Sequence, residues 1–256
     1  MSRLQKAISR IQRREPARGI GFGARSRQEP RAMLLGVLAD SGAAAKAAFE
    51  AGADVAIVRA SGGSNAAKEA KAAAGKNNDS VLGVWLSELD EGTSTALAQA
   101  ACDFVIGTLE GTVATAVDTD RMGQVLVAAS SMDDAILRAL GSLGLDALLV
   151  EHGKGAMSLA DQLQLVRLAS FASTPLLVTV AAEAPVNELR VLRDSGAACV
   201  LLSAGSSAAE IDAMSDRLRA VPARKPRREG GEIALVPSMA AAHANHEEEE
   251  EDDGEE

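Results

Sequence analysis

The chain has 256 residues, of which 47% are hydrophobic and only 2% aromatic, so it can build one large domain or two smaller ones around a largely aliphatic core. No apolar run reaches the roughly 18–20 residues that cross a bilayer, and no secretory signal begins the chain, so we expect a cytoplasmic protein without a membrane span. Cys102 and Cys199 each directly precede an apolar run, and we expect buried thiols rather than a disulfide.

The net charge of −10 is distributed unevenly along the chain. Residues 1–31 carry nine Lys or Arg against two acids, a balance of +7, whereas residues 243–256 carry nine acids and no Lys or Arg. Charge blocks of this kind are typical of solvated, disordered or partner-binding ends. We therefore expect a disordered acidic tail, and residues 1–15 or 247–256 are the candidate sites for a protein partner.

The first predicted element is a helix over residues 1–15, with basic side chains on one face and, on the other, Leu4, Ala7, Ile8 and Ile11. Two interpretations are open. The helix either caps the body of the protein or presents its basic face to an acidic protein or an anionic membrane surface. Residues 16–30, with three glycines between two prolines, are predicted to be a loop. The basic segment lacks interleaved aromatics and the rest of the chain is acidic, so no nucleic-acid binding is expected.

From residue 33 onward, apolar runs alternate with stretches that favour helices. Near-continuous apolar runs are typical of parallel strands that are buried on both faces. Eight such strands are predicted, at residues 33–39, 55–60, 81–87, 104–108, 125–130, 147–151, 176–181 and 199–203. Helices are predicted at residues 41–52, 64–75, 94–101, 131–144, 158–171, 186–196 and 207–221. The crossover at residues 109–124 has three Thr and two Gly and little helix signal.

A short sequence pattern recurs at junctions where a predicted helix is followed by a predicted strand. It reads "FEAGADVAIVRA" at residues 49–60, "AQAACDFVIGT" at 98–108, "SLGLDALLVE" at 142–151 and "RDSGAACVLLS" at 193–203. In each case a helix ends at a small or glycine-rich corner and four or five apolar residues follow. Repeated units of this kind resemble the aldolase-type TIM-barrel superfamily, whose units often end in "AGAD" and an apolar strand. The resemblance covers about three quarters of the chain and names no family within the superfamily.

The resemblance implies a (β/α)₈ TIM barrel at residues 33–221, with strands inside and helices outside. A basic N-terminal helix and loop at residues 1–32 would precede the barrel, and a linker with a disordered acidic tail would follow at residues 222–256. A doubly wound open sheet is the alternative, because the barrel segment is short and residues 109–124 lack a clear helix.

In TIM barrels the working residues follow the carboxyl ends of the strands. The densest polar cluster there is "VEHGKG" at residues 150–155, which follows the sixth predicted strand. Strand alternation places Glu151 on the same inward face as Leu149. Glu151 can act as a base or bind a divalent cation, and His152 can exchange protons near neutral pH, so both are predicted to be catalytic. The alternative is a polar rim in which Glu151 is paired with Arg59. Lys154 is disfavoured as a covalent catalyst because it lies in a loop beyond the strand.

Substrate binding is predicted for polar and glycine residues after the second and eighth strands, namely Arg59, Ser61, Gly62, Gly63, Ser203, Gly205 and Ser206. The spacing of Ser207 and Glu210 is that of a capping box, so a plain helix cap is the competing interpretation after the eighth strand. Arg59 is the expected partner of Glu151. Because the second and sixth strands lie across the barrel from each other, a direct contact and a bridge through a bound anion or Mg²⁺ are both open.

Magnesium is a candidate cofactor, with ligands drawn from carboxylates near strand ends: Glu151, Asp40 and Glu110. No Cys/His metal motif, P-loop or G-x-S-x-G motif occurs. Two functions therefore remain open. One is a lyase or isomerase-like enzyme acting on a small carboxylated or phosphorylated metabolite, which would be a small-molecule anion. The other is a degenerate, non-catalytic barrel that serves as a binding or scaffold protein, as the charged ends and the lack of glycine after the seventh strand favour.

Overall fold

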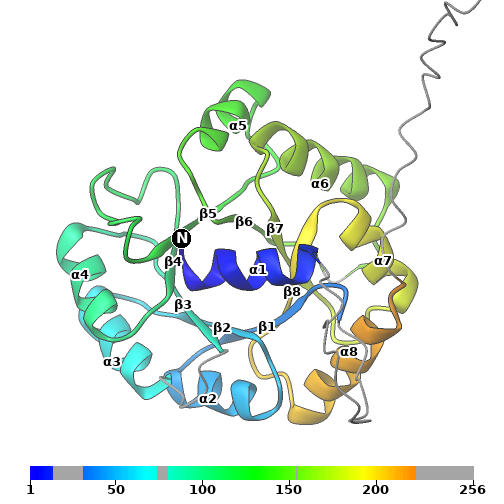
Figure 1. Cartoon of the computed structure of the whole chain (residues 1–256), viewed down its shortest axis with the longest axis horizontal. Coiled ribbons are helices and arrows are strands. Elements are labelled where there is room, and N and C mark those ends of the chain that lie inside the picture. The colour runs from blue at the N-terminus through cyan, green and yellow to red at the C-terminus, as the bar shows by residue number, and fades with distance from the viewer. Residues whose placement is uncertain (14–30, 74–79, 154, 223–256) are drawn as a thin grey trace, which may run out of the picture. The chain divides into compact units, whose positions relative to one another are not determined.

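The computed structural model describes residues 1–13, 31–73, 80–153 and 155–222. Eight parallel strands form a barrel in chain order, and β8 pairs with β1 to close it (Figure 1). The strands are β1 Leu34–Ala39, β2 Val55–Arg59, β3 Val81–Trp85, β4 Phe104–Gly107, β5 Gly123–Val127, β6 Ala147–Val150, β7 Leu176–Val180 and β8 Ala197–Leu202. The predicted barrel is confirmed, and its closure excludes the open sheet.

Strand side chains alternate between the barrel interior and the surface that the helices cover. On β2, Val55 and Ile57 pack inside the barrel, whereas Ala56 and Val58 pack toward the helices. The interior is aliphatic apart from the buried ring of Phe104. A Cβ added to Gly83 would lie 2.2 Å from this ring, so the close approach of β3 and Phe104 requires glycine. The middle of the barrel is therefore a packed core, as is usual for this fold.

Helices surround the strands, as Figure 1 shows. They are α2 Gly42–Glu50, α3 Gly63–Ala73, α4 Glu91–Gln99, α5 Asp134–Gly141, α6 Leu159–Ala172, α7 Val186–Asp194 and α8 Ala208–Ala220. Helix α4 begins three residues earlier than predicted because the Asp90 side chain accepts a hydrogen bond from the backbone N–H of Thr93 and caps the helix there. Asp133 likewise caps α5, which begins later than predicted.

Helix α1 (Arg3–Arg13) closes one end of the barrel. Leu4, Ala7 and Ile8 are buried among the interior side chains of the strands, and Figure 1 shows α1 lying across the barrel. The Ser2 hydroxyl donates a hydrogen bond to Asp146, which directly precedes β6. The end that α1 covers is therefore the amino-terminal end of the strands, and the interpretation of this helix as a cap is confirmed.

The aspartate of the recurring sequence pattern has a structural role. Asp54 and Asp103 precede β2 and β4, and each accepts a hydrogen bond of 2.9 Å from the backbone N–H of the preceding strand. Asp54 also pairs with Arg31 at 2.5 Å, and Asp103 pairs with Arg3 at 3.1 Å. Burial raises the pKa of Asp54 and of Asp146 above the usual range of a carboxyl group. Together with Asp146, these aspartates fasten the N-terminal segments to the closed end of the barrel.

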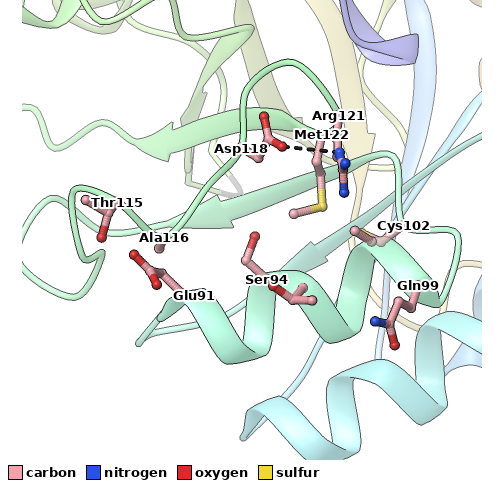
Figure 2. Close-up of a pocket in the computed structure, with 11 residues that line it drawn as sticks. Glu91, Ser94, Gln99, Cys102, Thr115, Ala116, Asp118, Arg121 and Met122 are labelled. Atoms are coloured by element: carbon pink, nitrogen blue, oxygen red, sulfur yellow. Dashed lines mark ion pairs between the residues drawn. The ribbon is translucent and has the colours of Figure 1, made fainter.

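No helix forms in the described crossover between β4 and β5, residues 108–122, as the poor helix signal there indicated. A hollow of about 450 Å³ lies between this crossover and α4 on the outside of the barrel (Figure 2). Glu91, Ser94 and Gln99 line it from α4, while Asp118 and Arg121 form an ion pair of 3.3 Å on the crossover side.

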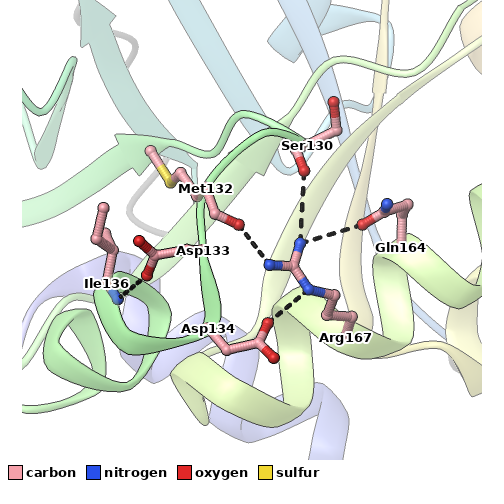
Figure 3. A network of polar contacts seen from close by, with 7 residues as sticks. All are labelled: Ser130, Met132, Asp133, Asp134, Ile136, Gln164 and Arg167. Carbon is pink, nitrogen blue, oxygen red and sulfur yellow. Dashed lines mark hydrogen bonds and ion pairs between the residues drawn. The ribbon is translucent and has the colours of Figure 1, made fainter.

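The loop between β5 and α5 is held by Arg167 of α6 (Figure 3). Its guanidinium pairs with Asp134 at 2.7 Å and donates hydrogen bonds to the carbonyl oxygens of Ser130 and Met132. It also contacts Gln164 of the same helix at 3.3 Å. Because these contacts use all three nitrogens of the guanidinium, Arg167 is a structural residue.

Three further sequence expectations concern single features of the chain. Cys102 and Cys199 are both free and buried, as predicted. None of the helices among the described residues is both long and apolar enough to cross a membrane. The loop predicted at residues 16–30 and the acidic tail predicted at the C-terminus fall outside the described residues.

Candidate functional site

The open end of the barrel carries a layer of polar side chains at the carboxyl ends of the strands. The inward alternation that buries Ile57, Leu149 and Leu177 continues two residues later. It places Arg59, Glu151 and Thr179 at this mouth. The sequence prediction that Glu151 lies on the face of Leu149 thus corresponds to its observed position.

Arg59 and Glu151 form a direct ion pair across the barrel, with 2.7 Å between Nη2 and Oε1. Glu151 is therefore paired with Arg59, as one of the sequence interpretations held, and no bridging anion or Mg²⁺ is needed, because both side chains are long enough to meet over the packed core. Arg59 also lies over the indole ring of Trp85, 4.2 Å from the ring centroid. The two side chains of the ion pair are 47% and 54% exposed, so the pair contributes only about 0–1 kcal/mol to stability.

His152 is fixed through its backbone to β7. Its backbone N–H donates a hydrogen bond of 2.8 Å to the Thr179 hydroxyl, which in turn donates one of 3.1 Å to the His152 carbonyl oxygen. The imidazole Nε2 atom is buried and makes no hydrogen bond within the described part of the chain. A buried polar atom without a partner costs roughly 1–3 kcal/mol, so a bound ligand that supplied one would recover that energy.

These residues line a hollow of about 580 Å³ at the mouth. It unites most of the predicted site: Arg59, Glu151, His152, Ser203, Gly205 and Ser206. Gly205 has a φ of +82°, a conformation that favours glycine, and the Ser206 hydroxyl donates a hydrogen bond to the Ser203 carbonyl oxygen. The loop after β8 is therefore a tight turn that exposes small polar groups to the hollow.

The remaining predicted residues lie elsewhere. Ser61, Gly62, Gly63 and Glu110 line a second hollow of about 450 Å³, beside the ends of β2, β3 and β4. Asp40 is exposed after β1 and lines neither hollow.

The predicted magnesium ligands are thus not brought together. Glu151 is engaged by Arg59, Glu110 belongs to the second hollow, and Asp40 lies apart from both. Among the residues that the structure describes, no group of three His, Cys, Asp or Glu could hold a metal ion. The side chains at the mouth therefore do not fit the Mg²⁺ site that the sequence suggested. Lys154 falls outside the described residues.

The start of α8 is closed by a capping box, as the spacing of Ser207 and Glu210 indicated. The Ser207 hydroxyl accepts a hydrogen bond from the Glu210 N–H at 3.3 Å, and the Glu210 carboxylate accepts one from the Ser207 N–H at 2.7 Å. These hydrogen bonds from the backbone and hydroxyl of Ser207 lower the pKa of Glu210. The carboxylate of Glu210 therefore stays ionised near neutral pH while it lines the mouth hollow.

Trp85, Thr179 and Glu183 were not among the predicted site residues, although each lies at or near the end of a strand. Trp85 is the register partner of Arg59 in the pairing of β2 and β3, so knowledge of that register would have identified the stacking contact. Thr179 and Glu183 line the same hollow as His152. Glu210 was interpreted only as a capping residue, because a spacing pattern does not reveal which cavity a side chain borders.

Comparison with known proteins supports the fold. No family model matches the chain, and no curated protein matches it. Among solved structures, a ligand complex of KGPDC from Streptococcus mutans is similar, with a TM-score of 0.60, 13% identity, and coverage of 74% of this chain and 98% of that one. The chain has a TIM-barrel fold.

Two further barrels extend this likeness. Thiamine phosphate pyrophosphorylase from Pyrococcus furiosus is similar with a TM-score of 0.56, 12% identity, and coverage of 74% of this chain and 96% of that one. Phosphoribosyl anthranilate isomerase from Thermus thermophilus is similar with a TM-score of 0.54, 14% identity, and coverage of 74% and 100%. At these identities the likeness concerns the fold, and the function has to be argued from the site.

Proposed function

We propose that the protein is a lyase or isomerase-like enzyme that acts on a small carboxylated or phosphorylated metabolite at the mouth of the barrel. The observation that carries this proposal is the position of Arg59, Glu151 and His152 around one hollow at the carboxyl ends of the strands. Active sites of TIM-barrel enzymes lie at this end. Two of the similar barrels, an isomerase and a pyrophosphorylase, have names that refer to phosphorylated compounds, which agrees with this class of chemistry.

Arg59 is the group that binds the acidic end of the substrate. Within the described residues its only hydrogen bond runs from Nη2 to Glu151, so the N–H groups on Nε and Nη1 can pair with a carboxylate or a phosphate. Stacking on Trp85 holds the plane of the guanidinium in place, which reduces the side-chain entropy lost on binding.

Glu151 and His152 are the groups that move protons. Arg59 holds one carboxylate oxygen of Glu151, and the other can accept a proton from a carbon beside a carbonyl or carboxyl group of the substrate. His152 lines the same hollow, and its buried Nε2 atom has no partner among the described residues; exchange of a proton with a substrate oxygen requires that the imidazole turn this atom toward the hollow. Thr179 holds the His152 backbone and so keeps the imidazole close to the hollow.

One observation favours the alternative of a binding module without chemistry. Arg59 and Glu151 neutralise each other in a direct pair, which is the arrangement expected for a polar rim. The two functions differ in whether a proton is exchanged on a bound small molecule, so they can be separated by one kind of experiment.

The test is exchange of substrate C–H protons with solvent deuterium, followed by proton NMR. The full-length protein is incubated in D₂O with a panel of small oxo acids, amino acids and sugar phosphates. We expect exchange on at least one compound, a loss of exchange by roughly 10²–10⁴-fold in Glu151→Gln, and an unchanged rate in Glu50→Gln, an exposed residue of α2. If the wild type exchanges nothing, or if Glu151→Gln exchanges as fast as the wild type, the proposed function is wrong.

A further inference from the structure

We infer, resting on the function proposed above, that the substrate of the mouth hollow carries a cationic amine together with a carboxylate and has no phosphate group. The observation behind this is the charge of the hollow. Among the described residues that line it, Arg59 faces three carboxylates, those of Glu151, Glu183 and Glu210. Glu151 already neutralises Arg59, so Glu183 and Glu210 have no Arg or Lys partner among the described residues that line the hollow.

The place where TIM barrels commonly hold phosphate is occupied here by the chain's own acids. That place lies in the loops after the seventh and eighth strands, at a helix N-terminus whose N–H groups face the anion. In this chain the loop after β7 contributes Glu183 to the hollow, and the Glu210 carboxylate lies at the start of α8, where it accepts the Ser207 N–H at 2.7 Å. A phosphate dianion would enter a position with negative charge on both sides, which disfavours its binding.

The same arrangement suits an ammonium group. The Glu210 carboxylate is held in place by the backbone and hydroxyl of Ser207, and these hydrogen bonds lower its pKa, so it presents a fixed negative charge near neutral pH. Clefts lined by charge of one sign raise the local concentration of the opposite charge. Ser203 borders the same hollow and adds a hydroxyl that can accept a hydrogen bond from an amine.

The two charged ends of the substrate would therefore be bound by different parts of the mouth. Arg59, over Trp85, binds the carboxylate, and the acids beside β7 and α8 bind the amine. This division fixes the orientation of the substrate relative to Glu151 and His152, because reversal would place like charges against each other at both ends.

The experiment uses three probes that differ in charge: γ-aminobutyrate, butyrate and inorganic phosphate. Binding to the full-length protein is measured by calorimetry and, independently, by the fluorescence of Trp85. Trp85 is the single tryptophan of the chain and lies under Arg59, so its emission reports on this site alone. We expect γ-aminobutyrate to bind at least about tenfold more tightly than butyrate, a difference of ~1.4 kcal/mol, and inorganic phosphate to bind least.

The variant that tests the charges is the double substitution Glu183→Gln with Glu210→Gln. Gln can keep the capping box of α8 while it removes the charge, so the fold is retained. We expect this variant to lose the preference for γ-aminobutyrate over butyrate and to bind inorganic phosphate more tightly than the wild type does. The control Glu50→Gln, with the same change of charge on α2, keeps the wild-type preference.

The outcomes separate this inference from the proposed function. If butyrate or inorganic phosphate binds the wild type as tightly as γ-aminobutyrate, while deuterium exchange still depends on Glu151, the inference is wrong and the function stands. The inference is also wrong if the double variant keeps the preference for the amine. If none of the three probes binds by either method, the inference is wrong, and the deuterium-exchange test alone decides the proposed function.

Discussion

The two ends of the barrel differ in how their charged side chains are bonded and exposed. At the amino-terminal end, Asp54, Asp103 and Asp146 are bound by backbone N–H groups or by residues of the N-terminal segments, and α1 covers the interior. At the carboxyl end, Arg59 and Glu151 meet in an exposed pair, and the buried Nε2 of His152 has no partner among the described residues.

This difference separates residues that stabilise the fold from residues that are free to bind a ligand. A carboxylate held by a backbone N–H beneath a helix cannot be removed without leaving a buried donor unpaired, which costs roughly 1–3 kcal/mol. An exposed ion pair contributes about 0–1 kcal/mol, so the chain loses little stability if a substrate replaces one partner. The comparison therefore assigns stability to the closed end and agrees with the proposal that the open end binds a ligand.

The largest expected effect on stability is that of removing a buried side chain of α1 from the core. Leu4 is completely buried among the interior side chains of the barrel, so Leu4→Ala should lower the free energy of unfolding by about 2–5 kcal/mol. Gln5→Ala, on the exposed face of the same helix, should change it by less than about 0.5 kcal/mol. Denaturant titration measures both. Equal and small effects would mean that α1 does not stabilise the barrel.

A smaller effect is expected from the pH dependence of the closed end. Burial raises the pKa of Asp146 in the folded protein above its ordinary value of 3.8, so the folded state binds more protons than the unfolded state between these two values. The carboxyl group's contribution to stability is therefore greatest at low pH and falls as the pH rises through this window.

Asp146→Asn removes this titration and keeps an acceptor for the Ser2 hydroxyl. The stability of the wild type relative to the variant should therefore decrease as the pH rises from 3.8 through the raised pKa of Asp146. Asp54, whose pKa is also raised by burial, is present in both proteins and cancels in the difference. A stability difference that is constant with pH, or that increases with pH, would contradict the assignment.

The barrel could be predicted from the sequence because the sequence signals of its strands and helices are local. The eight apolar runs, the caps of the helices and the small residues before each strand are all decided within a few residues of one another. Strand alternation also placed Glu151 beside the interior face of Leu149. The recurring aspartates were visible in the pattern, but their partners, such as Ser2 for Asp146, lie up to 144 residues away and required the fold.

The site was harder to predict from the sequence because its contacts join strands that are distant along the chain. The direct meeting of Arg59 and Glu151 depends on the width of the barrel and the length of both side chains, neither of which a strand pattern contains. Ser61, Gly62 and Gly63 follow the same strand as Arg59, yet the chain turns there into α3 and carries them to the other hollow. Glu210 serves as both a helix cap and a wall of the mouth hollow, and sequence spacing identifies only the first role.

The central claim is that the closed end stabilises the fold and that the open end holds the active site. It is tested most directly by measuring the unfolding free energy and the deuterium exchange of two variants. Asp103→Ala leaves the N–H of Leu82 without its acceptor and should lower the unfolding free energy by about 1–3 kcal/mol while deuterium exchange on the substrate continues. Glu151→Gln should change the unfolding free energy by less than about 1 kcal/mol and abolish exchange. If Glu151→Gln destabilises the protein as much as Asp103→Ala does and leaves exchange intact, the division of roles between the two ends is wrong.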